Sequence, residues 1–96
     1  MKAGVRVEYE IGKWTVESWR GSQHHTQWPE GRRDAASVLA AQLMWTGIRD
    51  TGTKSSHEGW AADMALVMLA RARRTGKPVT YEKELEVGEA DCRAVE

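Results

Sequence analysis

The sequence predicts an α+β fold, in which a three-stranded antiparallel sheet is covered on one face by an antiparallel pair of helices. Both ends of the chain alternate apolar and charged residues, which is typical of half-buried strands. Between them lie two segments with broad apolar stripes at helical spacing. The predicted order is therefore ββααβ. A sheet with one apolar face must be covered, and the helix pair is the available cover.

The composition is that of one ordinary globular domain spanning residues 1–96, with 41% hydrophobic and 29% charged residues. No apolar run approaches the roughly 18 residues that a membrane span needs. Residues 1–10 alternate charged and apolar side chains, so we expect no secretory signal there. Cys92 is the single cysteine, which excludes an internal disulfide and fits a reducing compartment. We therefore expect a cytoplasmic protein without membrane contact.

Residues 5–19 predict a β-hairpin. Gly12 as the first residue of a two-residue loop is typical of a type II′ turn, which would be completed by Lys13. This register places four apolar residues on one face of the hairpin and the charged residues on the other. It pairs Ile11 with Trp14 and Tyr9 with Val16.

Residues 20–31 predict a polar connection, because glycine and proline punctuate them and Trp28 is their single large apolar residue. One reading has Trp28 packing at the start of the following helix as a hydrophobic staple. Residues 32–50 predict that helix, and Thr51-Gly52-Thr53 would end it.

Residues 56–75 predict the second helix. Ser55 and Glu58 have the spacing of a capping box, and Gly76 is a helix-ending residue. Residues 79–87 alternate again and predict the third strand. We expect residues 88–96 to form a loose acidic tail.

Six cations form the first candidate site. An antiparallel helix pair brings the start of the first helix beside the end of the second, and Arg20 is also expected nearby. Such a cluster can hold phosphates, although cations at the end of a helix also simply offset its dipole. The cluster comprises Arg32, Arg33, Arg71, Arg73, Arg74 and Lys77.

Carboxylates form the second candidate site. The formal charge is +4 over residues 1–77 (12 basic, 8 acidic) and −4 over residues 78–96 (2 basic, 6 acidic). If the outer strands adjoin, their carboxylates form a field that could dock a basic partner, or that merely keeps the sheet from aggregating. The residues concerned are Glu8, Glu10, Glu17, Glu82, Glu84 and Glu86.

Tryptophans form the third candidate site. Trp19 falls on the polar face of the hairpin and Trp28 lies in a connection. Exposed aromatic residues near arginines are candidate hot spots for a partner protein or platforms for bases. The alternative is that both pack into small apolar clusters of their own.

No catalytic, metal or cofactor motif is recognisable. His24 and His25 are adjacent and His57 lies apart, so none has the spacing of metal ligands. Asp63 interrupts an apolar helical segment, which predicts that it either pairs with a buried donor, such as a tryptophan N–H or an arginine, or lies at an interface. Acidic neighbours of Cys92 disfavour a reactive thiolate.

These observations favour a small non-enzymatic regulatory protein that binds another protein through Trp19, Trp28, Glu82, Glu84 and Glu86. Its compact, motif-free character suggests an accessory or inhibitory factor of a phage or mobile element, of the anti-defence type such as an anti-CRISPR. The alternative is a nucleic-acid-binding module that uses the six cations. An enzymatic role would require a pocket that joins Asp63 or a histidine to other polar groups. Homodimerisation is a further hypothesis, because the sheet edges and the broad apolar helices offer surfaces for it.

Overall fold

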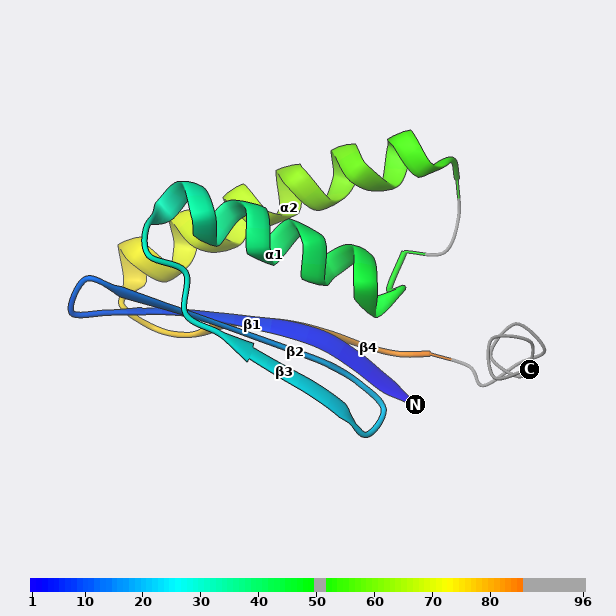
Figure 1. Ribbon diagram of the computed structural model, residues 1–96, viewed down its shortest axis with the longest axis horizontal. Coiled ribbons are helices and arrows are strands. Elements are labelled where there is room, and N and C mark those ends of the chain that lie inside the picture. The colour runs from blue at the N-terminus through cyan, green and yellow to red at the C-terminus, as the bar shows by residue number, and fades with distance from the viewer. Residues whose placement is uncertain (50–51, 86–96) are drawn as a thin grey trace.

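The computed structural model describes residues 1–49 and 52–85. Four strands form one antiparallel sheet in the order β3-β2-β1-β4, and two helices lie over one of its faces (Figure 1). The predicted α+β fold is confirmed, except that the sheet has four strands in place of three. In chain order the elements are β1 (Lys2–Glu10), β2 (Lys13–Arg20), β3 (Gln23–Gln27), α1 (Arg32–Thr46), α2 (Lys54–Thr75) and β4 (Val79–Glu84).

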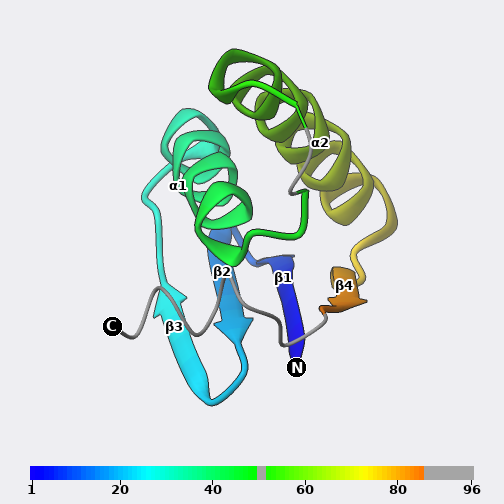
Figure 2. The same ribbon diagram turned by 90° about the vertical axis from the view of Figure 1, so that its right-hand side faces the viewer.

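The two helices divide the sheet between them. α1 packs over β2 and β1, and α2 packs over β1 and β4. An end-on view shows this two-layer arrangement, with β1 beneath the seam between the helices (Figure 2). The core therefore fills the space between the central strands and the helix pair. No described helix or strand covers the other face of the sheet, which we call the uncovered face.

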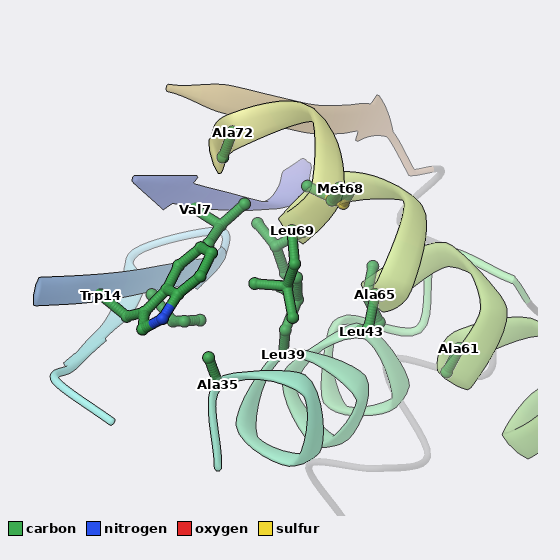
Figure 3. Close-up of a cluster of buried hydrophobic side chains, with 12 residues drawn as sticks. Val7, Trp14, Ala35, Leu39, Leu43, Ala61, Ala65, Met68, Leu69 and Ala72 are labelled. Carbon is green, nitrogen blue, oxygen red and sulfur yellow. The ribbon is translucent and has the colours of Figure 1, made fainter. Parts of the chain in front are cut away.

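The core is built around leucines from both helices and one tryptophan from the sheet. Leu39 of α1 and Leu69 of α2 are fully buried between the helices and the sheet. Trp14 of β2 belongs to the same cluster and lies at the end nearest the hairpin turn (Figure 3). Alanines at the helix contact, such as Ala35 and Ala65, let the helices approach closely. Burial of each large side chain contributes roughly 1.5–3 kcal/mol.

The hairpin turn differs from the predicted one by one residue. The loop is Ile11-Gly12, and both residues have positive φ (49° and 76°), as in a type I′ turn. Tyr9 therefore pairs with Trp14, and the two rings lie 4.5 Å apart between centroids. The predicted pairing of Ile11 with Trp14 was wrong, because a type I′ turn needs its glycine in the second loop position, not the first.

A fourth strand, β3, lies within the segment predicted to be a polar connection. Its five residues carry no apolar side chain, and most of them are exposed. The strand forms because its backbone pairs with β2 after a tight turn at Gly21, where φ is 61°. Backbone pairing at a sheet edge needs no apolar alternation, so the pattern could not reveal it.

The helix ends also differ from expectation. α1 stops at Thr46, because Gly47 takes the left-handed conformation (φ 69°) that ends a helix. α2 begins at Lys54, and Thr53, not Ser55, caps it by accepting a hydrogen bond from the backbone N–H of Ser56. Gly76 ends α2 as predicted. Residues 86 and 87 of the predicted third strand lie outside the described residues.

A tryptophan joins three strands on the uncovered face. Trp19 of β2 lies beside Gly4 of β1 and donates its indole N–H to the carboxylate of Glu82 on β4, at 2.8 Å. The indole can cross β1 only because Gly4 has no side chain. A Cβ at Gly4 would lie 2.7 Å from the Trp19 ring and 2.6 Å from the backbone oxygen of Tyr81.

We predict that Gly4→Ala lowers the free energy of unfolding by about 2 kcal/mol, the usual cost of overfilling a packed site. The measurement is urea unfolding followed by circular dichroism. Gly59→Ala is the matched control, because a Cβ there meets no atom within 4 Å. In a helix the same change should raise the stability by up to about 1 kcal/mol. Equal effects of the two substitutions would contradict the close packing at Gly4.

Candidate functional site

Surface features that could bind a partner gather at one end of the molecule. The β1–β2 turn, the start of α1 and the end of α2 all lie at this end (Figure 1). Two concavities open among these segments, one beside the turn and one between the helices. The fold thus brings together segments that are up to 63 residues apart in the sequence (Ile11 to Arg74).

The first feature is an apolar surface that we call the hairpin-end patch, defined by Ile11 and Trp28. Trp28 is 70% exposed and Ile11 is 92% exposed. Trp28 lines a concavity of about 570 Å³ between the hairpin turn and the connection to α1, and Ile11 immediately precedes Gly12, another residue of that lining. Trp28 therefore does not act as a hydrophobic staple for α1, which was one of its two predicted roles. The concavity is lined by Gly12, Lys13, Trp14, Trp28, Pro29 and Glu30.

The backbone at Ile11 is strained. A β-branched residue with a φ of 49° lies in the left-handed region that such residues rarely adopt. The conformation costs roughly 1–2 kcal/mol, and the exposed side chain buries almost no area within the chain to offset it. An unfavourable residue held at the surface in this way is typical of a site kept for binding, not for folding.

The second feature is the arginine pole, which we define as Arg32, Arg73 and Arg74. These three side chains and Ala70 line a concavity of about 360 Å³ between the start of α1 and the end of α2. Within residues 1–49 and 52–85, no carboxylate forms an ion pair with any of the three. The guanidinium of Arg73 also lies 5.1 Å above the Tyr9 ring, a cation–π contact that holds it in place.

The remaining predicted cations lie around the arginine pole without lining its concavity. Arg33, Arg71 and Lys77 are exposed, on the first turn of α1, the last turns of α2 and the loop after α2. Arg20, which was expected nearby, lies at the opposite end of the sheet. It pairs with Ala3, at the end of the hairpin that is farthest from the turn.

The carboxylates of the uncovered sheet face have partners within the chain. Arg6, at the centre of β1, forms ion pairs with Glu8 at 3.2 Å and with Glu17 at 3.3 Å. Glu84 lies 3.1 Å from the amino group of Met1, and Glu82 lies 3.9 Å from Lys2. The strands adjoin as expected, but cations interleave the carboxylates and much of the field is neutralised. Glu86 lies outside the described residues.

Trp19 and Asp63 differ in their environments from what the sequence suggested. Trp19 lies on the uncovered face as predicted, but its N–H is bonded to Glu82 and its ring lies beside Gly4. Asp63 is exposed on α2, so its predicted pairing with a buried donor was wrong. The reason is that the apolar residues of α2 extend to its solvent side, and Asp63 belongs to that side.

The histidines are dispersed over the described structure. His24 and His25 project to opposite faces of β3, and His25 packs edge-on against Trp45 of α1, with 4.6 Å between ring centroids. Residues 1–49 and 52–85 contain no group of three side chains that could hold a metal ion. Neither concavity is lined by a histidine or by Asp63. Cys92 lies outside the described residues.

Comparisons with protein families, curated proteins and solved structures found no match to the chain. In the part of the chain that the structure describes, no helix is long and apolar enough to cross a membrane. The two features at the hairpin end are therefore the candidate binding surfaces of the described chain.

We predict that Ile11→Asn raises the free energy of unfolding by about 1 kcal/mol, because asparagine tolerates the left-handed conformation of a type I′ turn. Urea unfolding of the two proteins measures the difference. Lys13→Asn, which lies next to the loop on β2, should give no such gain. A loss of stability in Ile11→Asn would show that the Ile11 side chain contributes to folding.

Proposed function

We propose that the protein acts by binding another protein through the hairpin-end patch. The observation that carries the proposal is the exposure of Trp28 at a concavity whose wall includes the hairpin turn, where Ile11 is exposed in strained backbone. Aromatic anchors surrounded by polar groups are typical hot spots of protein interfaces. Lys13 and Glu30 supply such polar groups at the concavity.

Trp28 is a stronger candidate for this role than the other predicted residues. The polar groups of Trp19, Glu82 and Glu84 already bond within the chain, so a partner would have to compete for them. A partner of Trp28 would not have to displace such bonds. Most of the Trp28 side chain is exposed, and binding would remove that apolar area from water, which is favourable. The role as an inhibitory or accessory factor of a phage or mobile element stays a prediction from the sequence.

We predict that Trp28→Ala weakens partner binding by about 2 kcal/mol, or roughly 30-fold, as is usual for a tryptophan hot spot. Tagged wild-type protein and variants would be used to purify partners from lysate of the source cell, with quantification by mass spectrometry. A partner should be retained by wild type and Glu84→Lys and lost by Trp28→Ala and Ile11→Asn. The loss should then be reproduced with the purified partner.

Ile11→Asn is the most informative of these variants, because it is expected to be more stable than the wild type. Loss of binding in this variant cannot be ascribed to unfolding. If all four proteins retain the same partners, the hairpin-end patch is not the binding surface.

A second candidate function is nucleic-acid binding at the arginine pole. It is supported by the convergence of Arg32, Arg73 and Arg74 on one concavity without carboxylate partners among the described residues. Arginine is suited to phosphate because its planar guanidinium donates two parallel hydrogen bonds. Gly31 offers no side-chain cap to α1, so the amides of the first helical turn are also directed to this end.

If the arginine pole binds nucleic acid, three phosphate contacts predict a slope of about −2 in log affinity against log salt for a single strand. Fluorescence anisotropy with labelled single-stranded and duplex oligonucleotides measures it. The double variant Arg32→Glu/Arg74→Glu should abolish binding. The control Lys54→Glu/Lys83→Glu has the same change of charge at exposed sites outside the pole, and it should retain binding. Absence of binding by the wild type at low salt would remove this candidate.

A further inference from the structure

The solvent side of α2 carries an apolar surface that nothing in the described chain covers. The buried side of the helix is formed by Ala61, Ala65, Met68, Leu69 and Ala72. On the opposite side Leu66 is 49% exposed and Val67 is 55% exposed. α2 is the outermost element above β1 and β4 (Figure 2). We call this surface the outer face of α2 and define it by Ala62, Asp63, Leu66, Val67, Ala70 and Arg74, all of them exposed.

Charged residues flank the apolar centre of this face with opposite signs. Asp63 lies four residues before Val67, and Arg74 lies four residues after Ala70. Four residues are about one helical turn, so each charge lies one turn from the apolar centre on the same side of the helix. In residues 1–49 and 52–85, Asp63 and Arg74 form no ion pair with any other residue.

The order of these charges distinguishes between the ways in which two such helices could meet. In an antiparallel pair with Val67 opposite the partner's Ala70, Asp63 lies opposite the partner's Arg74, and two-fold symmetry repeats the contact. In a parallel pair, Asp63 would face the partner's Asp63 and Arg74 would face the partner's Arg74, which is repulsive. The face is therefore complementary to itself in the antiparallel orientation only.

We infer that the outer face of α2 binds a second copy of this chain through an antiparallel α2–α2 contact. Leu66 and Val67 supply apolar area at the centre, and the two Asp63–Arg74 pairs between subunits set the orientation. A single helix face is small for an interface, so the dimer is a weak one that forms reversibly with concentration. The inference is independent of the hairpin-end patch, since Ile11 and Trp28 take no part in it.

Sedimentation equilibrium of the purified protein tests the inference, at concentrations up to about 1 mM, where a dimer with a dissociation constant near 1 mM would be detected. The wild type should shift from the monomer mass of 10.8 kDa toward twice that mass as its concentration rises. Val67→Glu should remain a monomer at all concentrations. Trp28→Ala removes a larger and more exposed apolar side chain elsewhere (70% exposed, against 55% for Val67), and it should associate like the wild type.

Charge exchange tests the orientation. Asp63→Arg and Arg74→Asp should each raise the dimer dissociation constant by about tenfold, because each replaces two attractive contacts with repulsive ones. The double variant Asp63→Arg/Arg74→Asp restores the complementarity and should return to the wild-type constant. Circular dichroism confirms that each variant folds. The inference is overturned if the wild type stays monomeric throughout, or if the double variant associates no better than the single ones.

Discussion

The pairing of β1 with β4 joins the first strand to the last strand that the structure describes, and the position of α2 depends on it. The two strands pair over six residues of β1, with Gly4 opposite Glu82. β4 supplies Val79 and Tyr81 to the surface beneath α2, and Tyr81 meets Trp60 of α2 edge-on, 6.1 Å between ring centroids. Without β4, α2 would have β1 alone beneath it. A methyl group at Gly4 would collide with the backbone oxygen of Tyr81, and it would therefore disturb the β1–β4 pairing that supports α2.

The two faces of the sheet are stabilised by different interactions, and this decides where binding surfaces remain. The covered face buries apolar side chains, whose contribution scales with the area removed from water. The uncovered face is held by two cross-strand contacts, Arg6–Glu17 and Trp19–Glu82, each worth roughly 0.2–1 kcal/mol. Because those polar groups already have partners, the uncovered face offers less to another molecule than its row of glutamates suggests.

Local chemistry explains which features could be predicted from the sequence. The fold class and the cation cluster were predictable, because alternation and helical stripes report burial and an antiparallel helix pair must bring its ends together. The strand β3 was not predictable, because it forms by backbone pairing with β2 and its side chains show no apolar alternation. The environment of Asp63 was mispredicted because continuous apolar sequence was taken for burial on all sides. The exposure of Trp28 beside the hairpin turn, and the strain at Ile11, could be found only once the turn residues and the strand register were known.

Arg74 belongs to both the arginine pole and the outer face of α2, so the two proposed contacts are linked. In the antiparallel dimer the partner's Asp63 would neutralise Arg74 and leave Arg32 and Arg73 alone at the concavity. By thermodynamic reciprocity, a phosphate that occupies Arg74 must weaken self-association by the same factor by which self-association weakens phosphate binding. The hairpin-end patch shares no residue with either contact. A partner protein bound there would therefore contact none of the residues through which phosphate binding and self-association compete.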